Sequence, residues 1–543
     1  MKFLQLFILI LTWSWCCSGN LLVKAGHTAI TLKGITEVRQ PLFADRPSPN
    51  QLSVKFAVSN TKKALQVTKV ELLFSSRSRL AALKEVSVSY SDTTNMQDAI
   101  VFGTSALIGK AMSVSGQQEL VNGLHCFNFS FGLYNNPDLL TGFHVDEIKL
   151  YFKNHKPVNF KNEGNYRYRP ALVLRAAGQD GVDTYRIPGL VTTDNGTLVA
   201  VYDVRYHNSK DLQEDIDIGM SRSTDKGQTW EPMKIIMDRG EWAGLPQNQN
   251  GIGDPCVLYD TRHQTLWVAG LWMSGAAPDK ALWWASQPGM SPDSTGQWLL
   301  AKSTDDGLHW SNLINITPQI KKPGWQLLLQ GPGRGITMSD GTLVFPAQFK
   351  EDIGAKAIDG GQYTCHSTIV YSQDGGNNWH MGTGAMSNTT ESQVVELSNG
   401  SLMLNMRDDR NRADKGADNG RAVCITADLG KTWATHPSSH AALPEPNCQA
   451  SLIAANVKLN GINRKVLFFS NPNDKTNRVH MTIKASLDEG LSWPEELQAE
   501  LNAAGGFGYS CLTMVDDHTI GIVYEGEKDL FFQKIPVEDL LGQ

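Results

Sequence analysis

An eight-residue phrase of the form Ser/Thr-x-Asp-x-Gly-x-x-Trp occurs five times in this chain of 543 residues. The copies occupy residues 223–230, 303–310, 372–379, 426–433 and 486–493. The Asp of such a phrase can accept hydrogen bonds from backbone N–H groups just ahead of it, and the Gly can adopt the positive φ of a tight turn. The Trp then covers the turn with a large apolar face. Because short apolar runs flank each copy, the pattern predicts repeated small antiparallel sheets, as in a β-propeller.

A second, less regular repeat marks one strand of each predicted sheet. Asn-Gly or Asp-Gly precedes an apolar alternation at residues 195–196, 340–341 and 399–400, with a degraded copy at 517–518. Such dipeptides are strong hairpin signals, and we expect the strands that follow them to lie near the propeller axis. These strands lead to polar residues at similar depths, namely Arg205, Gln348, Arg407, and the pair Tyr524 and Glu525. We therefore expect these residues on one rim.

The first part of the chain, residues 20–158, has a different pattern. It contains no copy of the phrase and no Trp. Val86, Val88 and Tyr90 alternate with Ser, as expected for half-buried antiparallel strands. The fold class is therefore predicted to be all-β, with a jelly-roll-like β-sandwich over residues 20–158 and a propeller over residues 159–543. The sandwich could bind carbohydrate or act as a spacer, and the lack of Trp argues against binding.

Residues 1–19 have the form of a secretory signal. Lys2 precedes a mostly apolar run that ends at Cys16-Cys17-Ser18-Gly19. We expect a secreted or periplasmic protein, with a lipid-anchored form as the weaker alternative. No other stretch is long and apolar enough to span a bilayer.

The composition argues against two other kinds of partner. The 49 basic and 55 acidic residues nearly balance, and no basic run indicates nucleic acid. The six cysteines beyond the signal are scattered singly, without the close pairs typical of zinc sites. We expect free buried thiols and no bound metal.

Tyr185-Arg186-Ile187-Pro188, followed by five copies of the phrase, resembles the sialidases, in particular the secreted bacterial exo-sialidases. The resemblance covers residues 171–536. It implies a six-bladed propeller that hydrolyses terminal α-linked sialic acid from glycans with retention of configuration and without a cofactor. Five copies leave one of six blades unmarked. We expect the last blade to lack the phrase and to be closed by a strand from the start of the domain. A monomer is expected.

The resemblance implies that three arginines from separate blades bind the substrate carboxylate. By motif these are Arg186, Arg407 and Arg478. A guanidinium suits this role because it is planar, always charged and forked.

The same carboxylate would repel an anionic nucleophile, and sialidases are the exception that uses a tyrosine. Tyr524 in Val523-Tyr524-Glu525 matches the family's nucleophile, and Glu391 matches the base beside it. Asp211, six residues beyond Arg205, is chosen as the acid that protonates the leaving oxygen. Nearby acidic residues could be confused with it, namely Glu214, Asp215 and Asp217.

Three further residues complete the expected site. Arg205 resembles the extra arginine that contacts a ring hydroxyl, and Asp254 resembles the acidic residue near the N-acetyl or ring-hydroxyl end. Gln348 is expected on the glycerol side. The alternatives are a sialic-acid-binding lectin, a structural propeller, and a trans-sialidase or a hydrolase of deaminated sialic acid. A lectin would be expected to lack one of the three catalytic groups.

Overall fold

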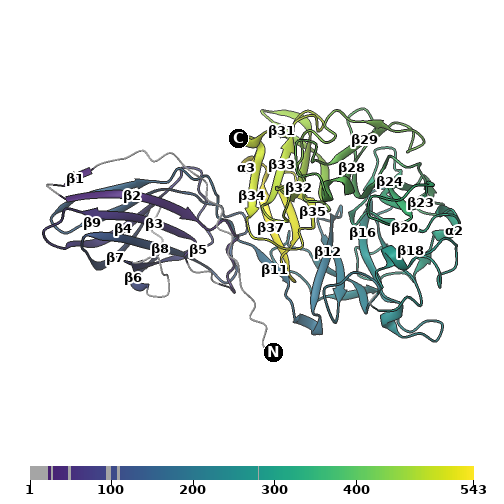
Figure 1. The fold of residues 1–543 in the computed structure, drawn as a ribbon, viewed down its shortest axis with the longest axis horizontal. Helices are drawn as coiled ribbons and strands as arrows, with labels where there is room; N and C mark the ends of the chain where they lie inside the picture. Colours follow the sequence, from purple (N-terminus) through teal and green to yellow (C-terminus); the bar gives the residue numbers. More distant parts are fainter. Residues whose placement is uncertain are drawn as a thin grey trace.

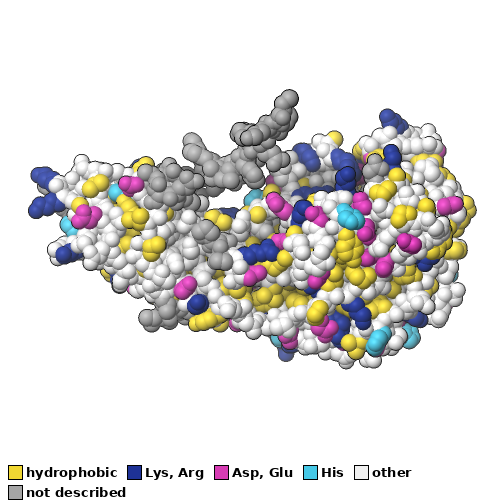
Figure 2. Space-filling view, turned by 90° about the horizontal axis from the view of Figure 1, so that it is seen from below, with side chains coloured by type: hydrophobic (Ala, Val, Ile, Leu, Met, Phe, Trp, Pro, Cys, Tyr) yellow, Lys and Arg dark blue, Asp and Glu magenta, His cyan; other side chains and the backbone are white. Residues whose placement is uncertain are grey.

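A computed structural model describes residues 23–25, 28–46, 50–92, 99–106, 111–278 and 280–542. Figure 1 shows two bodies side by side, an N-terminal sandwich and a ring of sheets that the later part of the chain forms. The expected signal at residues 1–19 lies outside the described residues. Over the face in Figure 2, acidic and basic side chains are interspersed. Among the described residues no helix is long and apolar enough to cross a bilayer.

Two antiparallel sheets form the sandwich. One has the order β1-β2-β3-β8-β5-β6 and the other β10-β9-β4-β7. Their bounds are β1 Val23–Ala25, β2 Thr28–Glu37, β3 Leu52–Ser59, β4 Leu65–Phe74, β5 Leu83–Ser91, β6 Ile100–Ala106, β7 Ala111–Leu120, β8 Gly123–Leu133, β9 Val145–Phe152 and β10 His155–Lys161. Alternate residues of β3 and β8, such as Val54 and Phe127, fill the core between the sheets. The edge strand β10 runs to Lys161, past the boundary expected at residue 158.

Six sheets form the ring, which confirms the predicted six-bladed propeller. The first three contain β12 Thr184–Thr192, β13 Leu198–Arg205, β14 Ile216–Ser223 and β15 Lys234–Met237; β16 Ile252–Asp260, β17 Thr265–Trp272, β18 Gln297–Ser303, β19 Ile314–Asn315 and β21 Gly333–Arg334; and β20 Leu327–Gln330, β22 Ile336–Thr337, β23 Leu343–Asp352, β24 Tyr363–Ser372, β25 His380–Met381 and β26 Met386–Ser387. The last three contain β27 Thr389–Glu396, β28 Leu402–Asp408, β29 Ala422–Thr426 and β30 Ala434–Thr435; β31 Ser451–Leu459, β32 Ile462–Pro472, β33 Met481–Ser486 and β34 Gln498–Asn502; and β35 Ser510–Asp516, β36 Thr519–Glu525, β37 Leu530–Pro536 and β11 Leu172–Arg175. The described part of the chain also contains three short α-helices, namely α1 Leu282–Ala285, α2 Thr317–Ile320 and α3 Val537–Leu541.

The ring closes through its first strand. β11 pairs antiparallel with β37, so that Leu172 lies opposite Phe532. This sheet carries no copy of the repeated phrase. The expectation that the last blade is unmarked and closed by a strand from the start of the domain is confirmed.

Each copy of the repeated phrase forms the turn between the third and fourth strands of its sheet. In the first copy, Gly227 N donates to Ser223 Oγ at 2.8 Å and Thr229 N donates to Asp225 Oδ1 at 2.9 Å. The glycine adopts a φ of 81°, a conformation in which a Cβ is strained. The other four copies repeat these two hydrogen bonds. The predicted turn chemistry is confirmed.

The strands that follow the Asn-Gly and Asp-Gly dipeptides were expected near the propeller axis. Many of the contacts between neighbouring sheets come from the first strands, β12, β16, β27, β31 and β35, and the strands β13 and β23 also contact the next sheet. The Asn-Gly strands are second in their sheets. Both kinds of strand are buried on both faces, so the pattern of apolar residues could not show which kind is first in its sheet.

Candidate active site

The polar ends of the strands lie at one end of the propeller and the repeated turns at the other. In the first sheet, Leu198 of β13 pairs with Ser223 at the turn, whereas Arg205, at the other end of β13, pairs with Ile216. In the third sheet, Leu343 of β23 pairs with Ser372 at the turn. The residues expected to bind substrate therefore lie on the face opposite the turns.

A tyrosine and a glutamate from different sheets meet at the centre of this face. Tyr509, directly before β35, donates a short hydrogen bond from its hydroxyl to Glu391 Oε1 on β27. Arg407 Nη1 donates to Glu391 Oε2 at 2.7 Å and to the Tyr509 hydroxyl at 3.2 Å. Burial and the charge of Glu391 raise the pKa of Tyr509 well above its ordinary value, against the opposing effect of Arg407 and Arg478. The phenol therefore stays protonated until a base removes its proton.

All three predicted arginines surround this tyrosine. The guanidinium of Arg186 lies 5.2 Å from the centroid of the Tyr509 ring, and that of Arg478 lies 5.6 Å from it. Arg407 is hydrogen-bonded to the Tyr509 hydroxyl. Three guanidinium groups therefore converge around one phenol, an arrangement that suits the binding of a carboxylate.

Glu525 fixes the relative position of two of these groups. Its Oε1 accepts hydrogen bonds from Arg186 Nε at 3.1 Å and from the backbone N–H of Ile187 at 2.8 Å. Its Oε2 accepts a hydrogen bond from the backbone N–H of Tyr509 at 2.8 Å. Ile187 has a φ of 55°, and the pairing of β12 with β13 shifts between Arg186 and Gly189. The Arg-Ile-Pro motif is therefore a bulge that turns Arg186 toward the cleft.

Asn447, which was not among the residues predicted from the sequence, connects the other two arginines. Its Oδ1 accepts a hydrogen bond from Arg407 Nη2 at 2.9 Å, and its backbone carbonyl accepts one from Arg478 Nη2 at 3.1 Å. Its amide donates to the carbonyl of Asp408 at 2.9 Å. Asn447 has a φ of 56°, a conformation that Asn tolerates better than most residues. An Asn in a loop gave no signal that would separate it from an ordinary turn residue.

Asp211 lies on the loop after β13, as predicted, beside two arginines. Its Oδ1 is 2.9 Å from Arg205 Nη1 and 3.2 Å from Arg186 Nη1, and its side chain is 67% exposed. Desolvation in the cleft raises the pKa of Asp211, but the two guanidinium groups outweigh it, so the pKa lies below its ordinary value. Arg205 is itself held by Asp203, whose Oδ2 lies 2.8 Å from Arg205 Nη2.

Asp254 lies beside this cluster. Its backbone N–H donates to Asp203 Oδ1 at 2.8 Å, and its φ is 58°. Burial and the charges of Asp203 and Asp211 raise the pKa of Asp254 well above its ordinary value. A carboxyl that holds its proton can donate a hydrogen bond, which suits the expected contact with a ring hydroxyl or an N-acetyl carbonyl.

The structure contradicts the predicted pairing of Tyr524 with Glu391. Tyr524 is 0% exposed, packs among aliphatic side chains such as Ile520 and Ile522, and donates its hydroxyl hydrogen bond to Gln533 at 3.0 Å. Successive residues of a strand point to opposite faces, so Tyr524 lies between the sheets when Glu525 points into the cleft. The phenol beside Glu391 belongs to Tyr509.

A signal for Tyr509 was present in the sequence. Glu391 precedes Arg407 by 16 residues, and Tyr509 precedes Glu525 by the same number. In both cases the first residue lies near or directly before the start of the first strand of a sheet, and the second lies at or near the end of the next strand. The repeat spacing could therefore have identified Tyr509.

Gln348 lies further from the cleft. Its side chain is buried, with Nε2 donating to the carbonyl of Gln330 at 3.4 Å and Oε1 lying 3.7 Å from Cys365 Sγ. Gln330 in turn donates to the carbonyl of Asp254. The structure therefore places Gln348 behind the site, in the packing that supports Asp254.

Within the described residues, no group of three or more His, Cys, Asp and Glu side chains could hold a metal ion. The six cysteines in the described part of the chain are free thiols, five of them buried.

Comparison with known proteins agrees with the geometry. The family model for a BNR repeat-like domain matches residues 187–496. A sialidase of Bacteroides fragilis is 45% identical over 464 residues, which cover 85% of this chain and 80% of that protein. A sialidase of Clostridium perfringens is 31% identical over 65% of this chain and 88% of its own length. The solved structure of the Hadza microbial sialidase Hz136 superposes with a TM-score of 0.78 and 39% identity, over 93% of this chain and 99% of that one. The chain belongs to the sialidase family and is an exo-α-sialidase, a glycoside hydrolase that acts on sialylated glycoconjugates.

Proposed function

We propose that Tyr509 is the nucleophile of this exo-α-sialidase and that Glu391 is its base. The observation that carries this proposal is the short hydrogen bond from the Tyr509 hydroxyl to Glu391, inside a ring of three arginines. A neutral phenol can approach the anomeric carbon without repulsion from the substrate carboxylate. Arg186, Arg407 and Arg478 bind that carboxylate and orient the sugar above the phenol.

The first step forms a bond between the Tyr509 oxygen and the anomeric carbon. Glu391 takes the phenol proton as the bond between the anomeric carbon and the glycosidic oxygen breaks, and Asp211 gives its proton to the leaving oxygen. In the second step, water attacks the anomeric carbon from the face that the leaving group vacated. Asp211 takes a proton from the water, and the Tyr509 oxygen regains the proton from Glu391. Two displacements at one carbon retain its configuration.

Substrate binding prepares Asp211 for its role as an acid. In the free enzyme Arg186 and Arg205 lower the pKa of Asp211, so that the carboxyl is ionised near neutral pH. A substrate carboxylate on Arg186 neutralises part of that positive charge. The pKa of Asp211 then rises, which favours the protonated form that the first step requires.

A sialic acid with fluorine at both C2 and C3 tests the nucleophile directly. Fluoride leaves from C2, and the fluorine at C3 slows the second step because it destabilises positive charge at the anomeric carbon. Digestion and mass spectrometry of the trapped protein are expected to find the label on the peptide that contains Tyr509. A label on the peptide that contains Tyr524 would refute the assignment.

We also propose that residues 1–19 direct export and are removed, so that the mature enzyme is secreted or periplasmic. A separate proposal is that the mature enzyme is a monomer. The short apolar run after Lys2 and the small residues at its end support export. The mass of the protein recovered from the medium and from the periplasm tests cleavage and location. Light scattering tests the monomer.

A further inference from the structure

An exposed tryptophan is fixed to the loop that carries Asp211. Helix α1 lies in the segment between β17 and β18, where Leu282 N donates to the carbonyl of Leu212 at 2.8 Å. Gln213 N donates to the carbonyl of Lys280 at 3.2 Å. Leu212 and Leu282 also belong to one buried apolar cluster. The backbone of α1 is therefore held against the residue that directly follows Asp211.

The side chain of Trp284 on α1 is held in place yet open to solvent. It is 51% exposed, and among the described residues it is the one tryptophan with an exposed side chain. The Lys350 ammonium lies 4.7 Å from the centroid of the Trp284 ring and 4.0 Å from that of Trp283. A Cβ on Gly361 would lie 3.0 Å from Trp284 Cζ3, so the backbone there packs against the edge of the ring. The indole is thus positioned before any ligand binds.

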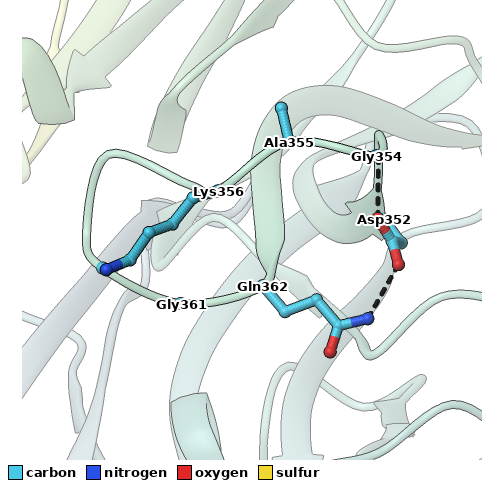
Figure 3. Close-up of a pocket in the computed structure, with 7 residues that line it drawn as sticks. Asp352, Gly354, Ala355, Lys356, Gly361 and Gln362 are labelled. Atoms are coloured by element: carbon cyan, nitrogen blue, oxygen red, sulfur yellow. Dashed lines mark hydrogen bonds between the residues drawn. The ribbon is translucent and has the colours of Figure 1, made fainter.

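A depression with polar side chains in its lining lies beside this ring. It has a volume of about 510 Å³ and is lined by Asp352, Gly354, Ala355, Lys356, Gly360, Gly361 and Gln362. Figure 3 shows Lys356 on one side and Asp352 and Gln362 on the other. Gln362 Nε2 donates to Asp352 Oδ2 at 2.7 Å, which fixes both side chains. The depression combines hydrogen-bond donors and acceptors next to a flat apolar surface.

The depression lies on the same face as the catalytic cleft. Asp352 pairs with Tyr363 at the end of β23 that is opposite the repeated turn. The segment with α1 follows Trp272, which pairs with Ile252 next to Gly253 and Asp254. The segment that carries Trp284 therefore lies next to the loop that carries Asp211, on this face.

We propose that Trp284 and the loop of residues 353–362 form a subsite for the leaving glycan. The first neutral pyranose after the sialic acid stacks its apolar C–H face on Trp284, and hydroxyl groups of that sugar or the next reach Lys356 and Gln362. This inference rests on the proposed role of Asp211, because the leaving oxygen marks where the glycan emerges. A positioned ring binds with little loss of side-chain freedom, which strengthens its contribution to affinity.

Trp284→Ala tests the subsite with two substrates that differ in the leaving group. Sialyllactose carries a disaccharide, whereas the methyl α-glycoside of sialic acid carries none, and free sialic acid is measured for both. We expect kcat/KM for sialyllactose to fall about tenfold, mainly through KM, and kcat/KM for the methyl glycoside to change less than about twofold. Trp284→Phe is expected to retain most of the preference for the glycan.

Leu308→Ala is the matched control, because Leu308 is an exposed apolar residue of the same sheet, in the turn at the opposite end. It is expected to change neither rate, and thermal melting checks that each variant is folded. An equal loss on both substrates, or no loss on either, would overturn the subsite. The proposed role of Asp211 is tested separately. An Asp211→Ala variant with the kcat of the wild type would overturn Asp211 as the acid, so failure of the acid and failure of the subsite are distinguishable.

Discussion

Acidic side chains have different roles at the two ends of the propeller strands. At one end, Asp428 accepts hydrogen bonds from the backbone N–H of Thr432 at 2.9 Å and from the hydroxyl of Thr426 at 2.8 Å, all within seven consecutive residues. At the other end, Glu525 accepts hydrogen bonds from Arg186, 339 residues away, and from Tyr509. The first carboxylate is solvated and local, whereas the second is buried and joins three strands.

This difference separates stability from catalysis. Hydrogen bonds to backbone N–H groups hold the turn carboxylates ionised without help from other sheets, and the pKa of Asp428 is lowered to about 2. At the rim, acidic and basic side chains lie close together and are shielded from water. Burial and the neighbouring carboxylates raise the pKa values of Asp254 and Tyr509. Groups whose pKa values are strongly shifted in a cleft are typical of catalytic sites.

The largest effect is expected from Tyr509→Phe, which removes the proposed nucleophile. Turnover should fall by about 10⁴-fold or more, while a substrate analogue still binds. Tyr524→Phe is the matched variant, because it removes a phenol hydroxyl from the adjacent strand. It should leave kcat nearly unchanged and lower the free energy of unfolding by about 1 kcal/mol, through loss of the bond to Gln533.

Steady-state kinetics and denaturant unfolding of both variants make this comparison. The reverse pattern, with turnover lost in Tyr524→Phe and kept in Tyr509→Phe, would contradict the structural assignment.

A smaller loss is expected from Asn447→Gly, since this residue holds two arginines but does not attack the substrate. Gly keeps the left-handed backbone, so the variant removes only the side-chain hydrogen bonds to Arg407, Asp408 and Asp409. We expect kcat/KM to fall about ten- to a hundredfold because Arg407 loses its orientation. Asn460→Gly, at an exposed hairpin position with a φ of 50°, is the control. Equal activity of the two variants would show that Arg407 needs no such support.

At the opposite end of the strands, Gly430→Ala should affect stability and not catalysis. Gly430 has a φ of 77°, and an added Cβ would lie 3.1 Å from the Trp433 ring. We expect the free energy of unfolding to fall by about 1–2 kcal/mol, with kcat of the folded enzyme unchanged. Gly324→Ala, where a Cβ meets no atom within 4 Å, is the control. A lowered kcat would mean that the turns influence the rim.

The smallest effect is expected from Asp428→Ala, and it should depend on pH. The pKa of Asp428 is about 2 in the folded protein, below the ordinary value of 3.8. The ionised carboxylate therefore adds stability above about pH 4, and this contribution is lost as the pH falls toward 2. The difference in Tm between wild type and Asp428→Ala should be positive at pH 6 and shrink by pH 3. A difference independent of pH would refute the electrostatic account.

Much of the site could be predicted because its residues lie in recognisable phrases. Arg186, Arg407, Arg478, Glu391 and Asp211 are all close to the cleft, as the resemblance implied. The prediction failed at Tyr524 because side chains of a strand alternate between two faces. The sequence Val523-Tyr524-Glu525 does not show whether Tyr524 or Glu525 faces the cleft. In the structure Glu525 faces it, and Tyr524, one residue earlier, points to the opposite face.

The sequence by itself determined the repeated turns, the all-β class and the unmarked sixth sheet. Each turn satisfies its own backbone groups with side chains no more than four residues away, so no distant partner was needed to recognise it. Only the tertiary structure decided which phenol meets Glu391 and which Asn holds the arginines. Those contacts join residues 118 and 40 positions apart, and their geometry depends on how six sheets close into one ring.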